Sequence, residues 1–205
     1  MTNLDRALAE ISAIRGQMAR ASQFRGYGPA TFAITGLMAM IAAAGQAVWI
    51  KAPAAHVPAY LTLWVGLAAV SAALIGLEMI TRSRRIHSDL ADEMILTAVE
   101  QFLPSAAAGA LITVTVVRFA PHSVALLPGL WQVVFGLGVF ASCRFLPRAL
   151  MAVGVWYLGA GLVSLAQSGG PQAFSPWTMG AAFGVGQLLV AFILHRNLGG
   201  EDERG

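Results

Sequence analysis

The sequence has little charge. Charged residues make up 11% of its 205 residues and hydrophobic residues 57%, whereas soluble domains average about 25% charged and about 45–50% apolar residues. This shortage of charge excludes a water-soluble globular domain. A membrane-spanning helix needs about 20 apolar residues, so a chain of this length has room for about six or seven spans and for no separate soluble catalytic domain.

Cysteine is nearly absent, and an apolar leader segment is missing. The single Cys143 lies in an apolar run and has no partner for an internal disulfide, so we expect a buried structural thiol. Asp5, Arg6 and Glu10 stand where a secretory signal peptide would need an apolar stretch. We therefore expect the N-terminus to be retained.

Sequence patterns for chemistry are missing too. The centres of the apolar runs carry no charged residue, and the chain has no nucleophile elbow, phosphate-binding loop, dinucleotide-binding turn or metalloprotease motif. The histidines have no Cys or carboxylate partners at ligand spacing; they are His56, His87, His122 and His195. These absences predict a protein without a catalytic site, metal or cofactor.

What the sequence does contain is six apolar runs of spanning length. They cover about residues 30–50, 60–80, 103–120, 130–146, 150–166 and 177–194. We predict an all-α, polytopic membrane bundle of six transmembrane helices, arranged as three hairpins, over residues 29–196. Outside the spans lie a helix over residues 1–28, a cytoplasmic insert over 81–101 and a short tail over 197–205.

Positive charge is sorted to one side of the predicted bundle. Of the 13 Lys and Arg residues, all but Lys51 and Arg118 lie before span 1, after span 2, between spans 4 and 5 or after span 6. Because positive charge marks cytoplasmic loops, both termini are predicted in the cytoplasm. Four tryptophans are expected at the opposite membrane interface: Trp49, Trp64, Trp131 and Trp177.

The predicted hairpins resemble one another. Spans 2, 4 and 6 are each entered through a Pro and then a Trp, as in Pro128 and Trp131. A threefold repeat is one interpretation; the alternative is that Pro is common in first helical turns and Trp at interfaces. Small residues in the spans predict close packing within the chain or between copies in a homo-oligomer. They include Gly66, Ala69, Ala73 and Gly76 in span 2 and Gly180 and Gly184 in span 6.

Apolar residues recur at helical spacing before span 1. They are Leu4, Leu8, Ile11, Ile14 and Met18. The spacing predicts an amphipathic helix that offers a surface to a cytoplasmic protein partner. The alternative is a helix on the inner leaflet, with its basic residues toward anionic lipid headgroups.

The same run continues through Arg15, Arg20 and Phe24 into a Gly-rich first span. In this pattern the chain resembles uncharacterised small bacterial inner-membrane proteins that have a cytoplasmic helix before their first span. The resemblance implies a bacterial inner-membrane location and implies no activity.

Uncharged polar and aromatic residues lie near the span centres. The candidates for a ligand pocket are Thr113, Thr115, Trp156, Tyr157 and Gln187. An amide and a phenol between apolar walls suit an apolar or aromatic ligand; interhelical hydrogen bonds are the alternative. Arg118, at the end of span 3, is a candidate contact for an anionic lipid headgroup, or it snorkels to the interface.

Two functions are compatible with these features. The contrast between plain spans and charged cytoplasmic segments favours a non-catalytic sensory, regulatory or scaffolding protein that contacts the lipid bilayer and a cytoplasmic partner. The hairpin pattern and the central polar residues favour, alternatively, a small transporter or channel for a neutral or hydrophobic solute. Nucleic acid is not an expected partner, because the basic residues do not cluster on one solvated face.

Overall fold

The structure, a computed structural model, describes residues 28–86, 89–143 and 148–202. Within these ranges the chain forms helices and no strand, so the predicted all-α class is confirmed. The α-helices are α2 Pro29–Trp49, α3 Val57–Ile86, α4 Asp89–Phe119, α5 Leu127–Ser142, α6 Met151–Ala166 and α7 Pro176–Asp202. Two short 3₁₀-helices are η1 Pro121–Leu126 and η2 Arg148–Leu150.

Five stretches of helix are long and apolar enough to cross a membrane. They are Pro29–Trp49, Val57–Thr81, Glu100–Phe119, Pro121–Ser142 and Pro176–Arg196. The sixth apolar helix, α6, is shorter than the about 20 residues that a span needs. The described helices therefore indicate a membrane-embedded bundle, and six spans remains a prediction.

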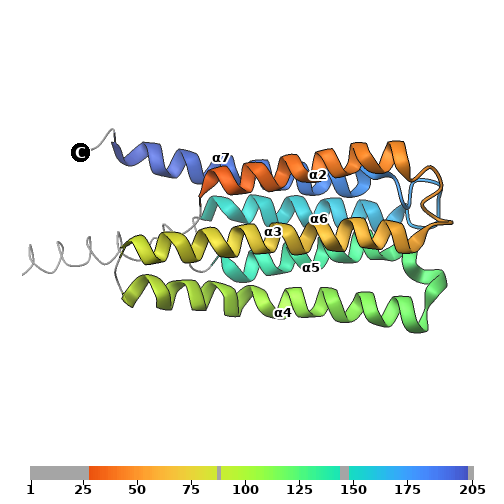
Figure 1. The fold of residues 1–205 in the computed structure, drawn as a ribbon, viewed down its shortest axis with the longest axis horizontal. Coiled ribbons are helices and arrows are strands. Elements are labelled where there is room, and N and C mark those ends of the chain that lie inside the picture. The colour runs from red at the N-terminus through yellow and green to blue at the C-terminus, as the bar shows by residue number, and fades with distance from the viewer. Residues whose placement is uncertain (1–27, 87–88, 144–147, 203–205) are drawn as a thin grey trace, which may run out of the picture.

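The helices alternate in direction along one long axis (Figure 1). The α2–α3, α4–α5 and α6–α7 connections gather at one end, which we call the loop end. The start of α2, the end of α3 and the end of α7 lie at the other end, which we call the terminal end (Figure 1). The tryptophans predicted at one interface all lie in the loop-end half of their helices; they are Trp49, Trp64, Trp131 and Trp177.

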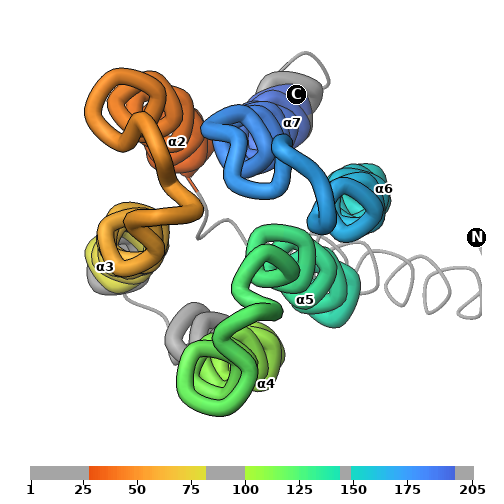
Figure 2. Tube along the Cα trace, turned by 90° about the vertical axis from the view of Figure 1, so that its right-hand side faces the viewer, coloured from red at the N-terminus to blue at the C-terminus, as the bar shows by residue number. Residues whose placement is uncertain are grey.

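Viewed along its axis, the bundle places the helices around a ring in the order α2, α7, α6, α5, α4, α3 (Figure 2). The most extensive contacts join α2 to α7 and α5 to α6, followed by α4 to α5. The contacts of α2 with α3 and of α6 with α7 are smaller, and those of α3 with α4 are slight. All three predicted hairpins thus make less extensive contacts than α2 with α7 and α5 with α6, which are pairs from different hairpins.

Close backbone approach explains the two tightest pairs. A methyl group on Gly129 of α5 would stand 2.9 Å from the carbonyl oxygen of Gly161 of α6. A methyl group on Gly36 of α2 would stand 3.0 Å from the carbonyl oxygen of Gly184 of α7. Lipid supplies no hydrophobic force between helices, so contacts between small residues decide which helices pair. The small residues of the sixth apolar run therefore serve packing within the chain.

The small face of α3 points away from the bundle. No atom of the described residues lies within 4 Å of the space that a side chain on Gly66 or Gly76 would occupy. Ala69 and Ala73, on the same face, are exposed. α3 is consequently open on this face, and the apolar stretches of α3 and α4 are the least buried of the five long ones.

The structure adds detail to two parts of the predicted organisation. The segment 81–101, predicted as a cytoplasmic insert, contains the end of α3, which runs to Ile86, and the start of α4 at Asp89. Pro104, which stands near the start of the third apolar run, lies inside α4. The residues before Pro104 are rich in Leu, Ala and Glu, which favour helix, so the helix extends through the proline at the loss of one backbone hydrogen bond.

Candidate functional site

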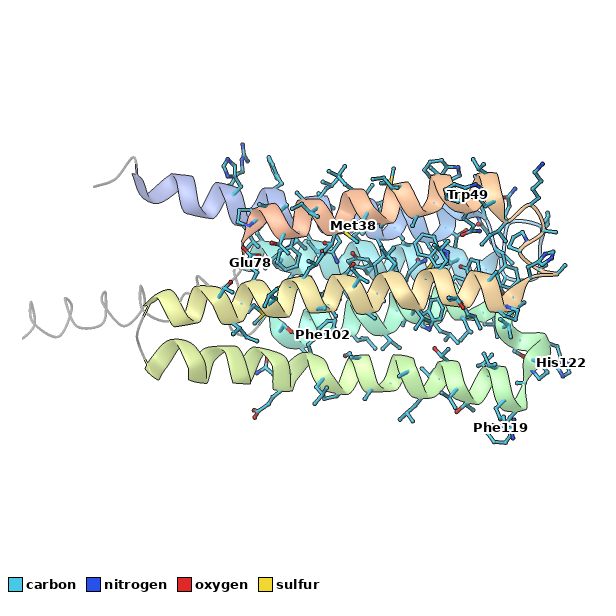
Figure 3. The ribbon with its side chains drawn as sticks, viewed as in Figure 1. Met38, Trp49, Glu78, Phe102, Phe119 and His122 are labelled. Atoms are coloured by element: carbon cyan, nitrogen blue, oxygen red, sulfur yellow. The ribbon has the colours of Figure 1, made fainter. Side chains whose placement is uncertain are left out.

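A group of aromatic rings joins four helices near the middle of the bundle. Phe102 of α4 lies 5.2 Å from Phe135 of α5, which lies 4.7 Å from Tyr157 of α6 and 5.3 Å from Phe183 of α7 (ring centroids). Gly138 admits the Phe102 ring, because a methyl group there would stand 2.8 Å from it. Edge-on and tilted ring contacts of this kind are favourable. We call these four rings the aromatic cluster; Phe102 is labelled in Figure 3.

Tyr157 is the polar member of the aromatic cluster. Its side chain is fully buried, and its hydroxyl lies against Gly186 of α7, where a methyl group would collide with it. No hydrogen-bond partner of this hydroxyl is present among the described residues. The hydroxyl therefore brings an unsatisfied donor and acceptor into an apolar interior, which is unfavourable unless something pairs with it.

Gln187 follows Gly186 directly on α7. Its Cβ would lie 3.1 Å from a methyl group on Gly36, so the side chain starts at the contact of α7 with α2. The residue is 7% exposed. Its Oε1 atom is also buried without a partner in the described part of the chain. One unpartnered polar atom thus comes from Tyr157 of α6, and another comes from Gln187 of α7.

The other predicted pocket residues lie elsewhere. The Thr113 hydroxyl donates to the Gly109 carbonyl (2.7 Å) and accepts a hydrogen bond from Trp131 Nε1 (2.8 Å). Thr115 is exposed. Trp156 is 36% exposed and its Nε1 donates across to the Ala182 carbonyl of α7 (2.8 Å). Of the five candidates, only Tyr157 and Gln187 combine burial with an unpartnered polar atom.

The candidate headgroup contact and the candidate partner surface lie away from this site. Arg118 is exposed in the last turn of α4, where a positive charge is favourable at a helix C-terminus. Its neighbours Phe119, 78% exposed, and His122 lie at the loop end (Figure 3). The partner surface falls outside the described residues; it consists of Leu4, Leu8, Ile11, Ile14 and Met18.

Two buried glutamines were not among the predicted site residues. Gln46 of α2 accepts a hydrogen bond from Trp64 Nε1 of α3 (2.7 Å) and donates to the carbonyl of Phe174, before α7 (2.9 Å). The signal for such a residue is a lone Gln inside an apolar run, because an amide in lipid needs partners on neighbouring helices.

Gln132 of α5 plays the same part on the other side of the bundle. It donates to the carbonyl of Thr178 of α7 (3.0 Å) and accepts from the Ser164 hydroxyl of α6 (3.1 Å). Together with the Gln46 contacts, these hydrogen bonds tie α2, α3, α5, α6 and the start of α7 in the loop-end half. Tyr157 and Gln187 lie farther from the loop end along α6 and α7. Tyr157 there belongs to the aromatic cluster.

The chemistry that the site offers is limited to neutral hydrogen bonding between aromatic walls. No group of three or more His, Cys, Asp or Glu that would suit a metal ion is found among the described residues. No family model, curated protein or solved structure matches the chain. The interpretation of the site therefore depends on its own geometry.

Proposed function

We propose that the protein is a non-catalytic membrane protein with a regulatory or scaffolding role, which acts on a protein partner through the charged segment at its terminal end. The observation that carries this proposal is the continuity of α3 and α4. α3 continues beyond the apolar run that the sequence marks over residues 60–80, to Ile86, and α4 begins at Asp89, before the apolar run over residues 103–120. An unbroken helix transmits a shift or rotation of its membrane part to its charged end.

The packing of the bundle supports this role. α2 packs tightly on α7 and α5 on α6, and the hydrogen bond from Gln132 to the Thr178 carbonyl joins the two pairs, whereas α3 makes only small contacts with α2 and α4. Elements with few buried contacts have the lowest local stability and are the ones that move. We infer that α3 moves against the rest of the bundle, because its contacts with α2 and α4 are small, whereas α4 is packed on α5.

The distribution of positive charge supports a partner on the cytoplasmic side of the membrane. In the sequence, 11 of the 13 Lys and Arg residues lie before span 1, after span 2, between spans 4 and 5 or after span 6, and such an excess favours the cytoplasmic side of a membrane. The resemblance in the N-terminal region favours a bacterial inner membrane. Transport of a neutral solute remains the alternative prediction from the sequence.

Cross-linked capture tests the proposal. The intact chain, a chain lacking residues 1–24 and a chain with Asp92→Asn and Glu93→Gln are expressed at equal levels in membranes. We expect the proteins cross-linked to the intact chain to be lost from both variants. The matched control carries Lys51→Gln and His56→Gln at the loop end and should retain them. Recovery of the same proteins with all four chains would contradict the proposal.

A further inference from the structure

We propose that the loop end of α4 binds an anionic phospholipid, whose phosphate lies at Arg118 and whose acyl chain lies along the apolar face of the same helix. This site is independent of the partner-binding role proposed above, because its test measures contact with lipid and not partner capture.

The face of α4 that contacts the acyl chain is uncovered in the bundle. No residue of the apolar stretch Glu100–Phe119 is buried, and the side chains of Leu111 and Val114 are 67% and 63% exposed. Residues three or four positions apart share one face of a helix, so Leu111, Val114 and Arg118 form one row. Arg118 stands at the end of this row that is nearest the loop end.

The charge of Arg118 is not balanced by a carboxylate at the same end. In the described ranges every Asp and Glu lies in the terminal-end half of its helix, from Glu78 of α3 to Asp202 of α7. Figure 3 shows Glu78 toward the terminal end and Phe119, next to Arg118, at the loop end. Glu100 of α4 stands about 27 Å from Arg118, at a rise of about 1.5 Å per residue. The helix C-terminus itself offsets only about half a unit charge.

The guanidinium group indicates the chemical class of the ligand. It presents parallel N–H donors that match two oxygens of a phosphate. The Cα–Cβ bonds of a helix tilt toward its N-terminus, so the Arg118 side chain starts toward the apolar row and not away from it. A zwitterionic headgroup would add an ammonium group, for which the described loop end holds no carboxylate. An anionic phospholipid therefore fits the site better than a zwitterionic one.

Lys51 provides the matched control, because it has the charge of Arg118 without the apolar row. It is also exposed at the loop end. It lies in the connection between α2 and α3, outside any helix, so it does not continue a row of apolar side chains on a helix face.

Cross-linking to photoreactive lipids tests the site. The full chain is reconstituted in phosphatidylcholine vesicles that contain a small share of either phosphatidylglycerol or phosphatidylcholine with a photoreactive acyl chain. The readout is the ratio of the two lipids cross-linked to residues 103–119. We expect an excess of phosphatidylglycerol on the wild type, and Arg118→Gln should lower this excess about fivefold, since one basic residue is lost near an anionic lipid. Arg118→Lys keeps the charge without the planar fork and should give an intermediate value.

The controls separate this site from general attraction of lipid. Lys51→Gln should give the wild-type ratio on residues 103–119, and cross-linking to α2 should be the same in all variants, which shows that each is inserted. An unchanged ratio in Arg118→Gln, or an equal fall in Lys51→Gln, would overturn the proposal. Loss of the excess when soluble glycerol phosphate is added would reveal a phosphate site that needs no acyl chain, and would also overturn it.

Discussion

At the scale of single residues, buried amides explain how polar side chains are accommodated in an apolar bundle. Gln46 and Gln132 each bridge two other segments through both ends of the amide. An amide that bonds at both ends keeps its helices in one register, since any slip would leave several groups unsatisfied. Burial at these positions is consequently tolerated where lipid offers no alternative partner.

Gln46→Leu should destabilise the bundle. The change leaves Trp64 Nε1 and the Phe174 carbonyl without their partner, which costs about 1–3 kcal/mol for each group that stays buried. Unfolding with denaturant in mild detergent measures this loss. Gln167→Leu, at an exposed position after α6, is the matched control and should have little effect. Equal stability of the two variants would show that the Gln46 hydrogen bonds contribute nothing net.

The residue scale also shows what sequence reasoning can and cannot find. Tyr157 and Gln187 were recognisable because a phenol and an amide in apolar runs are costly and few. That Thr115 and Trp156 lie apart from them could not be predicted, because packing decides which side of a helix faces its neighbours. Trp156 stands next to Tyr157 in sequence, yet its ring is a third exposed while Tyr157 is buried.

At the scale of helices, the pairing of α5 with α6 depends on the absence of side chains at the contact. A methyl group on Gly129 would stand 2.7 Å from Leu165 Cγ and 2.9 Å from the Gly161 backbone. The backbone cannot yield as a flexible side chain would, so the helices would have to separate. Packing energy is then lost along the whole contact.

Gly129→Ala should therefore lower the free energy of unfolding by about 1–3 kcal/mol. Gly66→Ala, on the uncovered face of α3, is the control: it gains helix propensity without a clash and should be neutral or stabilising by up to about 1 kcal/mol. Both values come from the same denaturant titration in detergent. A tolerated Gly129→Ala would mean that α5 and α6 are not in backbone contact.

Helix boundaries were predictable where the chain itself marks them. Pro29 and Pro176 begin helices, as a proline in a first turn favours. Pro104 has the same local setting but lies inside α4. A rule for proline in first turns cannot tell a helix start from a helix that continues through the proline, because the difference depends on the helix-forming residues upstream.

At the scale of the whole molecule, the apolar runs predicted the helices but not their partners. Helices that follow one another in sequence are joined by short connections. α2 nevertheless makes its most extensive contact with α7, the last of the described helices. In lipid, all apolar faces are equally well solvated, so close contacts such as Gly36 with Gly184 decide the arrangement. Hydropathy alone does not contain this information.

The sorted charge predicts an orientation of the bundle, which labelling can test. In a Cys143→Ala background, Lys51→Cys at the loop end and His195→Cys near the terminal end each provide one exposed thiol. A membrane-impermeant maleimide should label Lys51→Cys in intact cells and His195→Cys only after permeabilisation. The reverse pattern would place the charged segments outside and would contradict a cytoplasmic partner.

We propose that α3 and α4 connect the membrane bundle to a partner at the terminal end as continuous helices. Two glycines inserted after Thr81 interrupt α3 between its apolar and charged parts, while the same insertion after Ala54, in the loop-end connection, is the control. The measurement is the amount of partner cross-linked per inserted chain. We expect a severalfold fall for the Thr81 insertion and wild-type capture for the Ala54 insertion; equal capture by both would show that the continuity of α3 is not needed for partner binding.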